Sequence, residues 1–121
     1  MRLLIIDDEN PFTELAGAYL KLQGFEVETC NEPLVALELL RSKPYDGVML
    51  DLMMLPLDGL SILKRLREMP QHAKTPVFIL SAKMLSAQER GEIQTLGGRF
   101  IAKPFRPSIL VKTLREGLAH G

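Results

Sequence analysis

Four short apolar runs, each followed by charged or hydroxyl side chains, constrain the fold of this chain more than any other feature. The runs are Leu3–Ile6, Val48–Leu50, Val77–Leu80 and Phe100–Ala102. Such runs are typical of strands buried on both faces of a parallel sheet. The residues that follow them are Asp7 and Asp8, Asp51, Ser81, and Lys103. Because the carboxyl ends of parallel strands share one crevice, we expect these side chains to meet in a set suited to a divalent cation and a phosphoryl group.

Composition limits the function classes. A length of 121 residues predicts a single domain spanning 1–121, and 15 basic residues balance 15 acidic ones, so no basic footprint for nucleic acid is expected. No apolar run approaches the length of a membrane span, and Met1-Arg2 leads directly into a strand rather than a signal peptide. The single Cys30 excludes an internal disulfide and fits a reducing compartment. These features predict a cytoplasmic protein.

Helical patterns alternate with the apolar runs. Asn10 and Asn31 are expected to cap the first two helices, Gly24 to end the first, and Asp58-Gly59 to open the third. The segment Phe25–Cys30 alternates in polarity, which predicts an edge strand. A fourth helix over 84–96 carries only a thin apolar stripe and should dock weakly, and Pro107 begins a fifth.

Strict alternation of five strands and five helices predicts an α/β fold with a doubly wound parallel sheet. The flavodoxin-like strand order 2-1-3-4-5 places the first and third strands at the switch point of the sheet. Asp7, Asp8 and Asp51 would then end the two strands that flank the crevice.

The chain resembles the receiver domains of two-component response regulators over nearly its whole length. Asp7-Asp8-Glu9 resembles the acidic metal-binding pair of that family, Asp51 its phosphoacceptor, Ser81-Ala82 its hydroxyl and small residue, and Lys103-Pro104-Phe105 its Lys-Pro-Phe motif. The spacings of 43 residues from Asp8 to Asp51, 30 to Ser81 and 22 to Lys103 are also typical of the family. Four motifs in order are far more specific than any one of them.

The resemblance implies that Asp51 accepts a phosphoryl group from a phosphohistidine of a sensor kinase or phosphotransfer protein. It implies Mg²⁺, with Mn²⁺ as an alternative, held by Asp8, Asp51, the Met53 carbonyl and, through water, Asp7. Lys103 would neutralise phosphoryl charge. The chemistry would be self-phosphorylation and autodephosphorylation rather than turnover of an external substrate. No general base is needed, because an ordinary Asp51 is ionised at neutral pH.

A switch is implied by the same resemblance. Ser81 would move toward the phosphoryl oxygens, Phe100 would rotate inward, and the weakly docked helix 84–96 would shift. The output surface would then comprise helix 84–96, the strand containing Phe100 and the helix from Pro107. It would control a downstream protein or domain and could also pair two copies of the chain.

Departures from the family pattern identify where this chain should differ. Leu55 stands where the family usually has a proline, and Pro56 follows it; Leu96 replaces a common glycine, with Gly97-Gly98 next. Met53 and Lys83 occupy positions that tune the phosphate lifetime in the family. An apolar Met53 cannot orient an attacking water, which predicts slow autodephosphorylation.

Other residues have ordinary interpretations, and two other function classes remain open. His72 and His120 are expected at the surface, and Cys30 is expected to be an inert strand residue. A pseudo-receiver that only mediates interactions is one alternative, and a flavin or nucleotide enzyme of the same topology is the other. This chain contains neither a GxGxxG nor a GxxxxGK[ST] motif, which argues against the enzyme. The cognate kinase and output, and whether the chain stands alone or belongs to a longer regulator, do not follow from the sequence.

Overall fold

The computed structural model describes residues 1–54, 57–81, 84–103 and 106–119, and it confirms the α/β class and strand order predicted from the sequence. One parallel sheet is ordered β2-β1-β3-β4-β5. The strands are β1 (Arg2–Ile6), β2 (Glu26–Cys30), β3 (Gly47–Asp51), β4 (Val77–Ser81) and β5 (Gly98–Ala102). The helices are α1 (Asn10–Leu22), α2 (Pro33–Ser42), α3 (Gly59–Glu68), α4 (Ala87–Thr95) and α5 (Pro107–Ala119), with a short 3₁₀ helix, η1 (Pro70–His72).

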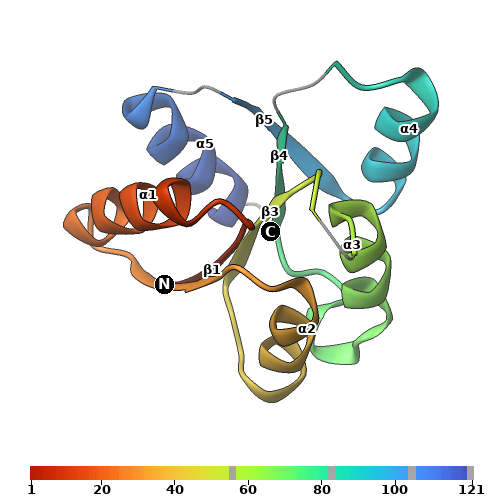
Figure 1. Cartoon of the computed structure of the whole chain (residues 1–121), viewed down its shortest axis with the longest axis horizontal. Helices are drawn as coiled ribbons and strands as arrows, with labels where there is room; N and C mark the ends of the chain where they lie inside the picture. Colours follow the sequence, from red (N-terminus) through yellow and green to blue (C-terminus); the bar gives the residue numbers. More distant parts are fainter. Residues whose placement is uncertain (55–56, 82–83, 104–105, 120–121) are drawn as a thin grey trace.

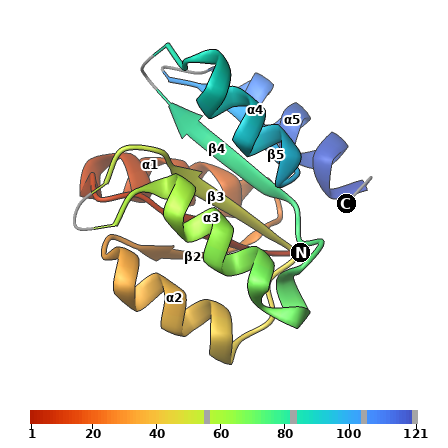
Figure 2. The same cartoon turned by 90° about the vertical axis from the view of Figure 1, so that its right-hand side faces the viewer.

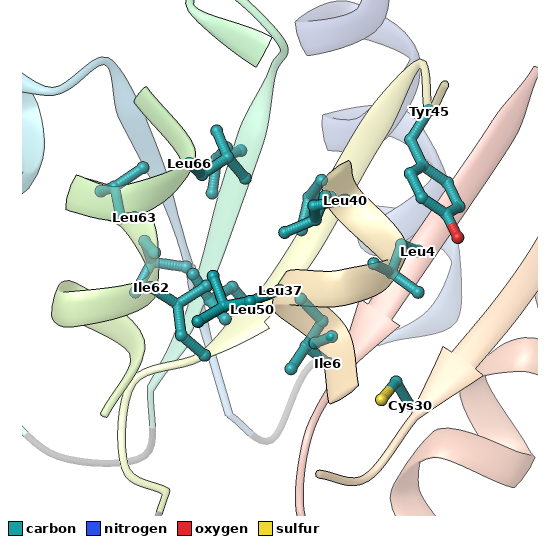
Figure 3. Packing of buried hydrophobic residues seen from close by; sticks show 14 of the residues in the cluster. Leu4, Ile6, Cys30, Leu37, Leu40, Tyr45, Leu50, Ile62, Leu63 and Leu66 are labelled. Atoms are coloured by element: carbon teal, nitrogen blue, oxygen red, sulfur yellow. The ribbon is translucent and has the colours of Figure 1, made fainter. Parts of the chain in front are cut away.

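Helices cover both faces of the sheet. Figures 1 and 2 show α1 and α5 on one face and α2, α3 and α4 on the other. Successive residues of β1 point to opposite faces, so Leu3 and Ile5 join the core under α1 and α5, whereas Leu4 and Ile6 join the core under α2 and α3. Figure 3 shows the second core, where leucines of α2 and α3 pack over the strands.

The predicted starts of the first two helices are each wrong by one residue. Glu9 occupies the N-cap of α1 and Glu32 that of α2, and neither side chain caps its helix. Asn10 is therefore inside α1, and Asn31 precedes the cap of α2. The prediction for the third helix is confirmed, since the Asp58 carboxylate accepts a hydrogen bond from the Ser61 N–H at 2.8 Å.

A glycine with positive φ ends α1, as the sequence predicts. Gly24 has φ of 95°, its N–H donates to the Lys21 carbonyl, and the Phe25 N–H donates back to Leu20. This pattern satisfies the last carbonyls of the helix, and glycine adopts the conformation without strain. β2 follows at the edge of the sheet, which confirms its predicted position.

Weak docking of α4 is also confirmed. This helix, all of which is described, buries one side chain, Ile93, whereas α3 buries Gly59, Ile62, Leu63 and Leu66. A capping box between Ser86 and Glu89 stabilises the start of α4 locally. Its stability therefore depends less on tertiary packing than that of α3 does.

The surface position expected for His72 is wrong. Its side chain is buried, with Nε2 2.8 Å from the Leu40 carbonyl oxygen and Nδ1 3.0 Å from Thr75 Oγ1. Its ring also stacks against that of Tyr45. His120 lies outside the described residues. Within the described ranges, no helix combines the length and apolar character that a membrane span requires.

Candidate functional site

Three carboxylates meet at the carboxyl end of the two central strands. Asp7 and Asp8 directly follow β1, and Asp51 is the last residue of β3, which pairs with β1 in the register Ile6 to Leu50. One carboxylate oxygen from each aspartate lies within 4.8 Å of the others. Asp7 and Asp51 are buried, while Asp8 is exposed. The cluster therefore has two buried acids at its base and one at its open side.

Lys103 brings a positive charge into this cluster from the end of β5. Its Nζ lies 2.7 Å from Asp7 Oδ2, 3.6 Å from Asp51 Oδ1 and 3.7 Å from Glu9 Oε1. Burial lowers the pKa of Lys103, but its hydrogen bond to Asp7 and the charges of the three acids outweigh this effect and raise the pKa overall. Lys103 is therefore a cation that lies closer to Asp7 than to Asp51 or Glu9.

The pKa of Asp51 is higher than the ordinary aspartate value expected from the sequence. Burial raises it to about 6, and the Asp7 carboxylate adds to the rise; the Lys103 charge and a hydrogen bond from the Met53 backbone oppose it. A carboxyl group with such a pKa is still about 90% ionised at pH 7. Asp51 is thus a carboxylate at neutral pH, although a more basic one than expected.

Backbone contacts fix the chain around Asp51. The Leu52 N–H donates to the Leu80 carbonyl at 3.0 Å, and the Gly59 N–H donates to the Leu52 carbonyl at 2.9 Å. A Cβ atom added at Gly59 would collide with the carbonyl oxygen of Asp51. Gly59 therefore allows the start of α3 to approach the end of β3, which holds Asp51 on a rigid strand end.

Ser81 and Phe100 occupy the neighbouring strands. Ser81 is the buried last residue of β4, and its carbonyl accepts the Lys103 N–H at 2.9 Å. Phe100 is half-buried in β5 and packs against the core under α2 and α3. The Arg90 guanidinium carbon lies 4.9 Å from the centroid of the Phe100 ring, so α4 and β5 also interact through a cation–π contact.

The predicted tuning positions lie beside the acids or outside the described residues. Met53 is 61% exposed, two residues beyond Asp51. Lys83, Leu55 and Pro56 lie outside the described residues, as do Pro104 and Phe105. Of the predicted site residues, the structure brings the side chains of Asp7, Asp8, Asp51 and Lys103 together.

Asn31 lies beside the site, a position that its sequence context does not predict. Its side-chain nitrogen donates to the Asp7 carbonyl at 2.7 Å and to Thr13 Oγ1 at 3.0 Å. An asparagine before a helix predicts a cap, and only the location of Pro33 at the first helical position could have suggested otherwise. Asn31 thus contacts the backbone of an acidic residue in the site.

Fold and site together define a doubly wound α/β protein with its polar residues at the topological switch point. A family model described as the response regulator receiver domain matches residues 3–115. The chain therefore belongs to the response regulator receiver family of two-component signalling, and the resemblance inferred from its motifs is confirmed.

A curated relative agrees with this assignment. The transcriptional regulatory protein SrrA of Staphylococcus aureus is 32% identical over 109 residues, which cover 90% of this chain and 44% of SrrA. The chain thus spans less than half the length of the curated relatives that it matches.

Solved structures show the same fold. The Vibrio cholerae chemotaxis protein CheY4 superposes with a TM-score of 0.89 at 27% identity, covering 96% of this chain and 97% of CheY4. The receiver domain of the Francisella response regulator 1452 superposes with a TM-score of 0.86 at 29% identity, covering 98% of this chain and 97% of that domain. The receiver domain of the Pseudomonas aeruginosa sensor histidine kinase PA1611, solved with magnesium in its active site cleft, superposes with a TM-score of 0.87 at 23% identity. This match covers 98% of this chain and 97% of the PA1611 domain, and it shows that the two share a fold.

Proposed function

We propose that residues 1–121 form one receiver domain whose Asp51 accepts a phosphoryl group from a phosphohistidine of a sensor kinase or phosphotransfer protein. The observation that carries this proposal is the meeting of Asp7, Asp8 and Asp51 within 4.8 Å, with Lys103 beside two of them. Ionised acids at such distances repel one another, and their proximity needs a compensating function. Binding a divalent cation and a phosphoryl group supplies one.

The donor set fits Mg²⁺, with Mn²⁺ as an alternative. Hard cations prefer carboxylate and carbonyl oxygens, and one or two carboxylates with several waters satisfy Mg²⁺. Asp8 and Asp51 would hold the ion directly, with the Met53 carbonyl, and Asp7 would act through water. The magnesium in the cleft of the PA1611 receiver domain supports this choice. When bound, the ion offsets the negative charge that gathers as a phosphoryl group approaches the acids.

Asp51 would act as the nucleophile. A carboxylate oxygen of Asp51 attacks phosphorus, the phosphorus–nitrogen bond of the phosphohistidine breaks, and its electron pair leaves with the imidazole, which then takes a proton from water. Asp51 is mostly ionised at pH 7 in spite of its raised pKa of about 6, so the attack needs no general base. Its position at the end of a rigid strand orients the attacking oxygen.

Lys103 and Ser81 would bind the transferred group. The Lys103 ammonium is already 3.6 Å from Asp51 Oδ1, so a small rotation away from Asp7 would bring it to a phosphoryl oxygen. Ser81, at the end of β4, would donate a hydrogen bond from its hydroxyl to another phosphoryl oxygen. Catalysis by these residues consists of positioning and charge neutralisation.

Weak docking of α4 supports the proposed switch. The described contacts of α4 are strongest near its C-terminus, where Ile93 is buried and Arg67 Nε donates to the Leu96 carbonyl at 2.7 Å. Movement of Ser81 and inward rotation of Phe100 would therefore shift the first turns of α4 more easily than its last. The surface of α4, β5 and α5 would control an output protein or domain, and it could also pair two copies of the chain.

Two side chains would set the lifetime of the phosphoryl group. Met53 is largely exposed beside Asp51 and offers no group that can orient an attacking water, so autodephosphorylation should be slow. Lys83 would be the second tuning residue. Met53→Asn is expected to shorten the phosphoryl half-life, and an unchanged half-life would contradict this role for Met53.

Incubation of the purified chain with phosphoramidate and Mg²⁺, followed by intact mass spectrometry, tests the proposal. We expect one phosphoryl adduct on the wild type, none on Asp51→Asn, and a strong reduction when EDTA replaces Mg²⁺. Asp46→Asn is a matched control, because Asp46 is an exposed aspartate at the opposite end of the sheet. A wild type without an adduct would favour the pseudo-receiver function, and equal adducts on the wild type and Asp51→Asn would contradict Asp51 as acceptor.

A further inference from the structure

Asn31 connects three elements that surround the acidic cluster. It lies between Cys30, the last residue of β2, and Glu32, the N-cap of α2. Its amide nitrogen donates to the backbone carbonyl of Asp7, after β1, and to Thr13 Oγ1 in the first turns of α1. A carbonyl oxygen can only accept, so the NH₂ end of Asn31 must face Asp7.

The bond to Asp7 acts on the peptide that joins two acids. The carbonyl that Asn31 binds at 2.7 Å belongs to the Asp7–Asp8 peptide. The N–H of Asp7 donates to the Cys30 carbonyl at 3.1 Å. Residues 30 and 31 therefore hold Asp7 from both sides of its backbone, and they fix the peptide plane from which the exposed Asp8 extends.

The side chain of Asp7 is held independently. Its Oδ1 accepts the Glu9 N–H at 3.0 Å, and its Oδ2 accepts Lys103 at 2.7 Å. Asp8 is exposed, so its direction depends on the Asp7–Asp8 peptide more than on packing. The bond from Asn31 thus controls the less constrained of the two consecutive acids.

We propose that Asn31 is a positioning residue for the metal: it orients the Asp7–Asp8 peptide so that the Asp8 carboxylate faces Asp51. This role rests on the proposed function of the site. Mg²⁺ demands near-ideal octahedral ligand geometry, and removal of outer groups that orient metal ligands typically lowers metal affinity about 10-fold to 100-fold. Asn31 does not cap α2, so its side chain is available for this role.

Metal affinity of the unphosphorylated protein tests the role directly. We expect Asn31→Ala to weaken Mn²⁺ binding about 10-fold, measured from the free Mn²⁺ signal in electron paramagnetic resonance, with Mg²⁺ affinity obtained by competition. Gln71→Ala is the matched control. The Gln71 amide also donates to backbone carbonyls, of Leu40 and Arg41, but at the opposite end of the sheet. It should lose a similar bond without a change in Mn²⁺ affinity.

Asn31→Asp separates positioning from charge and is nearly isosteric with the native residue. It replaces the donor by an acceptor that faces the Asp7 carbonyl, while it adds a negative charge near the cation. A charge effect would tighten Mn²⁺ binding, whereas loss of positioning weakens it. Circular dichroism at the temperature of the titration checks that each variant is folded, and Asn31→Asp keeps the test valid should Asn31→Ala unfold.

The outcomes distinguish this role from the function on which it rests. Weaker binding by both Asn31 variants with normal binding by Gln71→Ala supports positioning. Binding by Asn31→Ala within twofold of the wild type, tighter binding by Asn31→Asp, or an equal loss in Gln71→Ala would overturn the role while the metal site stands. A wild type that binds no Mn²⁺ would overturn the proposed metal site, and the role of Asn31 with it.

Discussion

The two ends of the sheet hold buried polar groups in opposite ways. At the carboxyl end, Asp7 and Asp51 are buried with only part of their charge balanced by Lys103, and burial raises the pKa of Asp51 to about 6. At the amino end, the buried His72 and half-buried Arg67 bond backbone carbonyls at 2.7 to 2.9 Å. Like charges therefore repel one another at the carboxyl end, whereas hydrogen bonds connect neighbouring loops at the amino end.

This difference separates stability from function within a small domain. Hydrogen-bonded polar groups specify the connections at the amino end, whereas grouped acids reduce stability until a cation or a proton relieves them. Such a trade between stability and a reactive site is common in proteins. α4 connects the two ends of the sheet. At the amino end, Arg67 donates a hydrogen bond to the carbonyl of Leu96, the residue after α4, whereas the first turn of α4 lies toward the site.

His72→Ala should give the largest effect and tests the amino end. The variant removes the ring that bonds the Leu40 carbonyl and Thr75 Oγ1 and leaves a cavity against Tyr45. We expect the free energy of unfolding to fall by about 3 kcal/mol, from urea denaturation followed by circular dichroism. A loss below about 1 kcal/mol would mean that this end is not the stabilising one.

Arg67→Met should have the next largest effect. It keeps the apolar stem but removes the donors to the carbonyls of Leu96, His72 and Thr75. We expect a loss of about 2 kcal/mol in unfolding free energy and faster hydrogen exchange in α4 than in α3. Lys64→Met is a control, because Lys64 also lies on α3 but interacts with α4 through an exposed ion pair, with Glu92 at 3.7 Å. Equal exchange in α4 for both variants would contradict the anchoring role of Arg67.

At the carboxyl end the expected sign is reversed. Asp51→Asn removes a buried carboxylate that is repelled by Asp7 and should raise the unfolding free energy by about 2 kcal/mol at pH 8. Asp46→Asn should not, since the Asp46 carboxylate accepts the Arg2 N–H at 2.7 Å at the other end of the sheet. A lower unfolding free energy for Asp51→Asn than for the wild type would contradict the view that repulsion between the acids destabilises the carboxyl end.

The pH dependence of that gain follows from the raised pKa. Asp51 binds its proton more tightly in the folded chain, with a pKa of about 6, than in the unfolded chain, near 3.8. Folded wild type therefore gains stability as pH falls from 6 toward 4. The advantage of Asp51→Asn should be full above pH 6 and vanish near pH 4, and an advantage that grows as pH falls would refute the assignment.

The strands and their order could be predicted because apolar runs and strict alternation of strand and helix leave few topologies. The helix starts near Asn10 and Asn31 could not, since capping preference is local and Asn31 instead bonds Asp7, 24 residues away. The burial of His72 depends on the Leu40 carbonyl, 32 residues away, which no local pattern reveals.

The site was predictable in membership and less so in electrostatics. Strand ends identify Asp7, Asp8, Asp51 and Lys103, because parallel strands open into one crevice. That Lys103 pairs more closely with Asp7 than with Asp51, and that the pKa of Asp51 is raised, depends on distances and burial in the folded chain. Sequence spacing contains neither quantity.

Mg²⁺ should have the smallest effect on stability of the changes considered, and it should act only through the acids at the carboxyl end of the sheet. An ion that binds only the folded chain stabilises it by about 1.4 kcal/mol at ten times its dissociation constant. The gain should be smaller at pH 5 than at pH 8, because protonated Asp51 must lose its proton to bind the ion. Thermal unfolding with and without Mg²⁺ measures it, with Asp8→Asn as the variant that should lose it. An equal gain in Asp8→Asn would show a general salt effect and no relief of the repulsion between the acids.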